Sequence, residues 1–153
     1  MRSTFAAGTF AFVLATVLSA QTPKTADLEQ PNKEFAAAVN AKDLARLAAA
    51  YTDDAVLMPP NGQVVKGRTR IQAFWKELID QGMRVESVTS TGSAASGMLG
   101  YDSGVVELRF APAFGSPVMD TVKFVTILHR DSDGTWRIAR DIWNSDLPTG
   151  LGK

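Results

Sequence analysis

The chain has 153 residues, enough for one domain with a sizeable hydrophobic core. Its 16 Lys and Arg residues balance 16 Asp and Glu residues, so no net charge directs it to nucleic acid or to an anionic membrane surface. The absence of cysteine excludes disulfides, thiol catalysis and cysteine-ligated metal sites.

The first twenty residues differ in composition from the rest of the chain. Arg2 precedes an apolar run from Phe5 to Leu18, and small residues end the segment at Ala20. This order is typical of a secretory signal peptide, residues 1–20. The alternative is a membrane anchor, but the run has about 14 residues and spanning a bilayer takes roughly 20. We therefore expect cleavage before Gln21, no membrane attachment afterwards, and a periplasmic or secreted protein.

Three segments are expected after the signal peptide. Residues 21–26 form a polar linker, residues 27–147 one folded domain and residues 148–153 a short tail. Apolar residues follow helical spacing in the first half of the domain and alternate with polar residues in the second half. Helices followed by hairpin-linked strands predict a cone-shaped α+β fold, with three N-terminal helices packed on a curved antiparallel sheet.

Two short helices are predicted first. One lies between Asp27 and Asn40, and Pro31 is a possible start because the first turn tolerates proline. The second follows Asp43, whose side chain can cap it, and carries Tyr51 on its apolar face. It is expected to end at residues 52–54, before a short strand at 55–58 and a Pro-Pro-Asn-Gly turn.

The third helix has the clearest pattern. Thr69 and Gln72 are spaced as a capping box, and Gly82 marks the end of the helix. Its apolar stripe consists of Ile71, Phe74, Trp75, Leu78 and Ile79. Four strands are predicted after it, at Arg84–Ser90, Tyr101–Phe110, Val118–Arg130 and Thr135–Asn144.

The third of these strands indicates how the sheet is covered. Lys123, Val125 and Ile127 point to one face, and two of them are apolar. Because a sheet face in water is normally polar, this pattern favours a partner on the outer face, and a symmetric homodimer is the commonest solution.

Together, these segments resemble the superfamily named after nuclear transport factor 2, the NTF2-like proteins. Within it the chain is most similar to the SnoaL-like proteins, including the SgcJ/EcaC-type group DUF4440. The matching stretches are Ala38–Leu44, Tyr51–Gly62, Gly67–Ile71, Gly100–Gly104 and Asp133–Asn144. The resemblance implies helices across a curved sheet, a pocket between them and a dimer. Functions in this superfamily range from isomerases and cyclases to binding modules, so the fold does not decide the activity.

The resemblance does not extend to the ketosteroid isomerase site. That site uses a carboxylate base, a tyrosine and a protonated aspartic acid. By approximate position, the base corresponds to Pro59 here, the tyrosine to Phe35 and the second acid to the region of Thr126. Proline and phenylalanine cannot exchange a proton, so this activity is not expected.

The last strand carries the main site candidates. Strict alternation places Arg140 and Asn144 on the face of Ile138, directed into the pocket, where they would anchor the polar end of a ligand. An internal ion pair of Arg140 is the alternative of equal weight. A bulge in this strand would instead direct Asp141 and Trp143 inward.

Other candidates are weaker. Asp141 and Glu107 are the possible acids or bases, although Glu107 is more readily explained as a surface carboxylate paired across strands. Tyr51, Tyr101 and Trp75 are aromatic residues with a polar tip that can line a ligand pocket, or else pack in the core.

No metal or cofactor is expected, because the single histidine, His129, has no acidic cluster with metal-ligand spacing near it. The sequence thus predicts an exported pocket protein that binds a small, largely apolar molecule. Isomerase- or hydrolase-like chemistry is left open. The alternative is a non-catalytic dimeric module that binds another protein.

Overall fold

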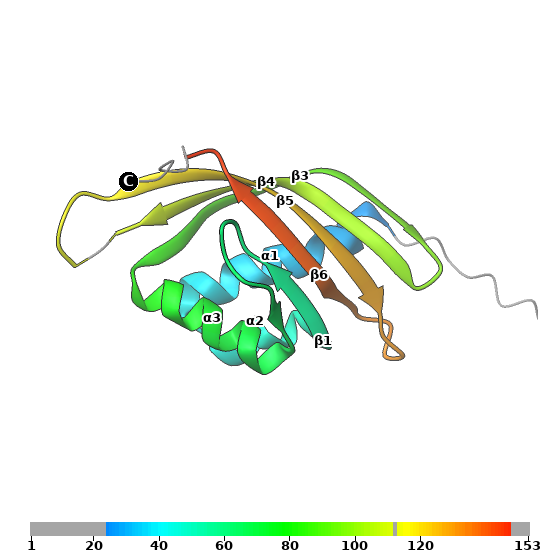
Figure 1. Ribbon diagram of the computed structural model, residues 1–153. Coiled ribbons are helices and arrows are strands. Elements are labelled where there is room, and N and C mark those ends of the chain that lie inside the picture. Colours follow the sequence, from blue (N-terminus) through cyan, green and yellow to red (C-terminus); the bar gives the residue numbers. More distant parts are fainter. Residues whose placement is uncertain (1–23, 112, 148–153) are drawn as a thin grey trace, which may run out of the picture.

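The computed structural model describes residues 24–111 and 113–147. The predicted signal peptide, residues 21–23 of the predicted linker and the predicted tail lie outside these ranges. Figure 1 shows three helices on the concave side of a strongly curved sheet, so the predicted α+β arrangement is confirmed. Within the described ranges, no helix combines the length and the apolar character needed to cross a membrane.

Helix α1 (Thr25–Ala41) begins within the predicted linker and continues through Pro31. Leu28 and Pro31 are both buried, so packing stabilises the first turns although Pro31 has no amide hydrogen to donate. The helix ends at Lys42, whose left-handed backbone (φ 56°) lets its amide donate to the carbonyl group of Ala38.

Helix α2 (Leu44–Ala49) is capped as predicted, because the Asp43 side chain accepts a hydrogen bond from the Arg46 amide at 2.9 Å. The placement of Tyr51 in this helix was wrong. Tyr51 begins strand β1 (Tyr51–Met58) and pairs in parallel with Ile138 of strand β6 (Trp136–Ser145). Pairing with a strand distant in sequence therefore overrides the local helical spacing.

Helix α3 (Arg68–Asp80) buries the predicted stripe, including Ile71 and Trp75. The predicted capping box is absent, because the N-cap is Gly67, two residues before Thr69. Gln72 instead donates from Nε2 to the Leu44 carbonyl at 2.9 Å and links α3 to α2.

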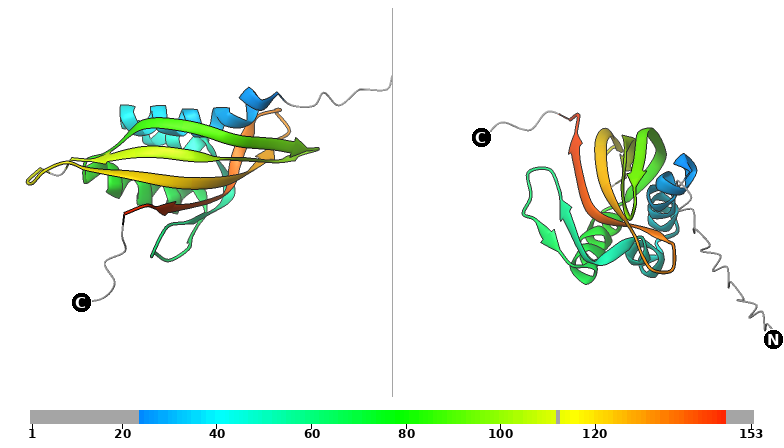
Figure 2. Two further views of the ribbon diagram at one scale, coloured as in Figure 1. Left: turned by 90° about the horizontal axis from the view of Figure 1, so that it is seen from above. Right: turned by 90° about the vertical axis from the view of Figure 1, so that its right-hand side faces the viewer.

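The sheet has six strands in the order β2-β1-β6-β5-β4-β3. The remaining strands are β2 (Val65–Lys66), β3 (Met83–Ser96), β4 (Leu99–Phe110) and β5 (Val118–Arg130). Every neighbouring pair is antiparallel except β1 and β6, which are parallel. The sheet is therefore mixed, whereas a purely antiparallel sheet was predicted. Figure 2 shows that the sheet twists and curls around the helices.

The two faces of the sheet differ as the alternation in β5 predicted. Val122 and Phe124 are buried on the inner face, against the helices. Lys123, Val125 and Ile127 are exposed on the outer face. The inner face therefore belongs to the core, and the outer face is open in the single chain.

Candidate functional site

A cavity lies between the helices and the inner face of the sheet. Its volume is about 40 Å³ with the side chains as they lie, well below the roughly 300–1,000 Å³ typical of small-molecule sites, so a ligand larger than a few atoms enters only if lining side chains move. Asn32 of α1 and Asp141 of β6 supply an amide and a carboxyl group. The rest of the wall is apolar or aromatic, and includes Phe35, Trp75, Met83, Leu108, Phe124 and Trp143.

Asp141 is the carboxyl group of the cavity, and only 7% of the residue is exposed. Its Oδ2 accepts a hydrogen bond from the hydroxyl of Tyr51 at 2.6 Å. That hydroxyl accepts one from Nε1 of Trp75 at 3.0 Å. Among the described residues, no donor reaches Oδ1 of Asp141. One oxygen is therefore fixed by β1 and α3, while the other has no partner among the described residues.

The surroundings of Asp141 change its acidity. Burial raises the pKa of Asp141 to about 6, and the hydrogen bond from Tyr51 opposes this rise. Burial and the nearby carboxylate hold the pKa of Tyr51 well above its usual value, so the phenol retains its proton. A carboxyl that titrates near neutral pH inside an apolar cavity can serve as a general acid or base.

A bulge in β6 decides which side chains enter the cavity. Ile127 pairs with Arg140 and Leu128 with Ile138, so Ala139 is an extra residue in the strand. Beyond Ala139 the alternation is inverted, and Asp141 and Trp143 point inward.

The expected inward orientation of Arg140 and Asn144 was therefore wrong. Both side chains are exposed on the outer face, because the extra residue Ala139 reverses the alternation of the strand beyond it. Arg140 donates to the carbonyl of its own neighbour Ala139 at 2.6 Å. The structure thus agrees with the alternative in which Asp141 and Trp143 face the pocket.

The fold places some of the remaining candidate site residues in the cavity wall and others away from it. Trp75 lies in the cavity wall, whereas Tyr51 is fully buried behind Asp141 and does not reach the cavity. Tyr101 is exposed on the outer face. Glu107 is half-buried on that face and accepts a hydrogen bond from the Thr121 hydroxyl at 3.0 Å, away from the cavity. Asp141 and Trp75 are thus the predicted candidates that line it.

A second buried carboxyl escaped the sequence analysis. Asp102 of β4 is fully buried, and its Oδ2 accepts hydrogen bonds from Asn32 at 2.8 Å and Ser90 at 3.0 Å. Burial raises the pKa of Asp102 as well, and those hydrogen bonds oppose the rise. The available signal was the spacing of Gly100 and Gly104, two residues on either side of Asp102 and on the same face. A side chain at Gly104 would collide with the Thr89 carbonyl.

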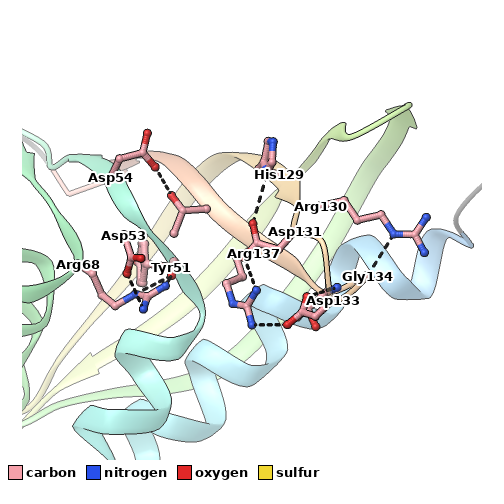
Figure 3. Close-up of polar contacts among 12 residues, drawn as sticks. Tyr51, Asp53, Asp54, Arg68, His129, Arg130, Asp131, Asp133, Gly134 and Arg137 are labelled. Carbon is pink, nitrogen blue, oxygen red and sulfur yellow. Dashed lines mark hydrogen bonds and ion pairs between the residues drawn. The ribbon is translucent and has the colours of Figure 1, made fainter.

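Charged groups outside the cavity pair with one another (Figure 3). Arg68 donates to the Tyr51 carbonyl at 2.9 and 2.6 Å and pairs with Asp53 at 2.7 Å, which holds the start of β1. Arg137 pairs with Asp131 and Asp133 and closes the turn between β5 and β6. These contacts explain local structure, and several of the groups also line a wider, more polar hollow that includes His129 and Arg140.

Within residues 24–111 and 113–147, no group of three or more His, Cys, Asp or Glu side chains is arranged to hold a metal ion. His129 lies outside the cavity, with Nδ1 3.3 Å from Oδ1 of Asp131. In the cavity, Asp141 can transfer a proton and Asn32 can form hydrogen bonds.

A search of the curated proteins found no match to this chain. Solved structures match it closely in fold. A ketosteroid isomerase-like protein from Erwinia carotovora atroseptica is 21% identical, with a TM-score of 0.65, over 80% of this chain and 96% of that one. A candidate dehydratase of the NTF2-like family from Streptomyces avermitilis is 16% identical, with a TM-score of 0.66, over 80% and 98%.

The name of a third similar structure describes an association domain and not an enzyme. It is a candidate association domain of calcium/calmodulin-dependent protein kinase II from Xanthomonas campestris, 15% identical, with a TM-score of 0.69, over 92% of this chain and 100% of that one. At these identities the likeness shows the NTF2-like fold alone. The family model of the SnoaL-like domain matches residues 32–140, well over half of the chain, and the protein therefore belongs to the SnoaL-like family.

Proposed function

We propose that the protein binds a small, largely apolar molecule in the cavity and that Asp141 exchanges a proton with it. One observation carries this proposal: a carboxyl group with a free oxygen lies in an otherwise apolar cavity, held through its other oxygen by Tyr51 at 2.6 Å. A pKa of about 6 leaves Asp141 mostly ionised at neutral pH and ready to accept a proton.

Isomerase- or dehydratase-type chemistry is the reaction class that we propose for this arrangement. Both reactions move a proton to or from the substrate, which one desolvated carboxylate can perform. Among the described cavity residues there is no serine, threonine, histidine or lysine, so proton transfer in the cavity falls to Asp141. The names of the Erwinia and Streptomyces structures agree with such chemistry.

The test uses nitrobenzisoxazole, a flat apolar probe that reports on any carboxylate base. The base takes the proton from the carbon beside nitrogen, the C–H electron pair completes the nitrile, and the N–O bond breaks to release a coloured phenolate. We expect turnover that rises with pH around 6 and is lost in Asp141→Asn. Glu107→Gln is the matched control, since it neutralises a carboxylate outside the cavity. Equal rates in wild type and Asp141→Asn would refute the proposal.

The outer face supports a homodimer as part of this proposal. Tyr101, Val125, Ile127 and Ile142 lie on adjacent strands and are between 39% and 48% exposed. Covering such a strip removes apolar surface from water. This strip also favours the alternative function, a non-catalytic module that binds another protein. Light scattering on Ile127→Lys tests both: a dimer in wild type that becomes a monomer supports self-association, and a monomeric wild type contradicts it.

Export is the last part of the proposal, and it rests on the pattern of residues 1–20 alone. We expect a mature protein that starts at Gln21 in the extracytoplasmic fraction. Mass measurement of the protein from that fraction checks the start. A full-length protein retained in the cytosol would contradict it.

A further inference from the structure

We propose that the ligand of this cavity is a small organic cation, an ammonium group on an apolar body, held by the carboxylate of Asp141. The inference rests on the proposed function in one respect, because it assigns the ligand to the same cavity. It goes beyond the proposed function by naming the chemical class of the ligand.

The first argument is that the unused hydrogen-bonding capacity of the cavity consists of acceptors. Nδ2 of Asn32 already donates to Asp102 at 2.8 Å and to Thr126 at 3.0 Å, which uses both of its hydrogens. Oδ1 of Asn32 and Oδ1 of Asp141 have no donor among the described residues.

The donors near the cavity are already engaged or closed off. Nε1 of Trp75 donates to Tyr51, and the Tyr51 hydroxyl donates to Asp141. Nε1 of Trp143 is sealed from solvent, so a ligand does not reach it without movement of the ring. A ligand that completes this cavity therefore supplies hydrogen-bond donors, as an ammonium does and a ketone or an ester does not.

The second argument is charge. Among the residues that the structure describes, the cavity wall contains a carboxyl group but no Lys, Arg or His. A carboxylate buried among apolar groups is costly until a positive charge is placed next to it. Four rings line the same wall, those of Phe35, Trp75, Phe124 and Trp143, and aromatic faces attract cations. An anionic ligand would meet this carboxylate with no cation to offset the repulsion.

The pH dependence follows from the groups that face Asp141. Tyr51 of β1 is the titratable group in contact with it and retains its proton. Trp75 of α3 is not titratable, and Asp102 lies two strands away on the same inner face, across Thr126. Cation binding requires the Asp141 carboxylate. It therefore strengthens as the pH rises through about 6 and then stays level until the ammonium itself loses its proton.

Four probes on one skeleton test the proposal: benzylamine, benzyl alcohol, benzaldehyde and benzoate. Binding is followed at about pH 7.5 by the indole N–H signals in protein NMR spectra. Signals of Trp75 and Trp143 should move, while that of Trp136, which does not line the cavity, serves as the internal control. We expect benzylamine to bind about tenfold more tightly than benzyl alcohol, because a charge-assisted hydrogen bond is roughly twice as strong as a neutral one. Benzaldehyde should bind more weakly still, and benzoate least.

Asp141→Asn should abolish the preference for benzylamine over benzyl alcohol while both still bind, and Glu107→Gln should leave it unchanged. If Asp141→Asn does not fold, wild-type titrations at about pH 5 and pH 7.5 replace it, with benzylamine binding weaker at the lower pH. Equal binding of benzaldehyde and benzylamine would overturn the cation proposal and leave the pocket function standing. If none of the four probes moves the signals of Trp75 and Trp143, both proposals fall.

Discussion

Asp141 and Asp102 are two carboxyl groups on one face of one sheet, and they differ in what surrounds them. Asp102 is fully buried and accepts hydrogen bonds from the Asn32 and Ser90 side chains. Asp141 accepts one hydrogen bond, from Tyr51, and borders the cavity with its other oxygen. Burial raises the pKa of both.

The difference separates a carboxyl that is closed off inside the fold from the one on which the proposed function rests. The hydrogen bonds to Oδ2 of Asp102 join α1 to strands β3 and β4 and fix the helix on the sheet, while Oδ1 of Asp102 is sealed from solvent without a partner among the described residues. The free oxygen of Asp141 is not used by the fold. A buried polar group that is left incompletely paired costs stability, and proteins retain such groups at functional sites.

The largest expected effect comes from removing the support of Asp102. Asn32→Ala deletes the amide that donates to both Asp102 and Thr126. We expect the free energy of unfolding to fall by about 3 kcal/mol, because a buried carboxyl loses a donor. Urea unfolding measures it, with Lys33→Ala on the exposed side of the same helix as the control. A loss no greater than that of the control would remove the structural role of Asp102.

The second prediction concerns a substitution that should stabilise the protein at neutral pH, Asp141→Asn. The pKa of Asp141 is about 6 in the folded protein against an ordinary value of 3.8, so the folded state holds the extra proton between these values. Stability contributed by this group is present at low pH and is lost as the pH rises to 6. Relative to Asp141→Asn, wild type should therefore lose about 2 kcal/mol between about pH 4 and pH 7. Parallel stability curves for the two proteins would contradict this prediction.

A smaller effect concerns the hydrogen bond to Asp141. The bond from Tyr51 lowers the pKa of this carboxyl, so Tyr51→Phe should raise it by about one unit above 6. Carbon NMR of the Asp141 carboxyl measures the shift. Tyr101→Phe is the matched control, because Tyr101 lies on the outer face. An unchanged pKa in Tyr51→Phe would mean that Tyr51 does not tune the site.

The smallest effect belongs to Arg140. Arg140→Ala removes an exposed side chain that donates only to its neighbouring backbone carbonyl, so the free energy of unfolding should change by less than about 0.5 kcal/mol. The indole signals of Trp75 and Trp143 should stay in place. A shift of those signals would show that the Arg140 side chain affects the structure of the cavity.

Local patterns predicted much of the secondary structure. The observed bounds of β5 are those predicted from alternation, and the buried stripe of α3 was visible in the spacing of Ile71, Trp75 and Ile79. The errors lie where a distant segment intervenes. Tyr51 has helical spacing but joins β6, and β3 extends to Ser96 because it pairs with β4 along its whole length.

The candidate site shows the same division. Trp75 and Asp141 were among the predicted candidates, but the bulge at Ala139 decided that Asp141, and not Arg140, enters the cavity. One additional residue in a strand exchanges its two faces, and the pairing that accommodates this residue is a property of the sheet. Asp102 and Asn32 were missed because they are 70 positions apart and meet only when α1 packs on β4.

By itself, the sequence determined the composition of the helices and strands, the α+β order and the apolar character of both sheet faces. These properties depend on neighbours a few residues apart, which periodicity records. The tertiary structure alone decided the inward side of β6, the parallel contact of β1 and the pairing of Asp141 with Tyr51. Each of these depends on contacts between segments far apart in the chain, and local spacing carries no information about them.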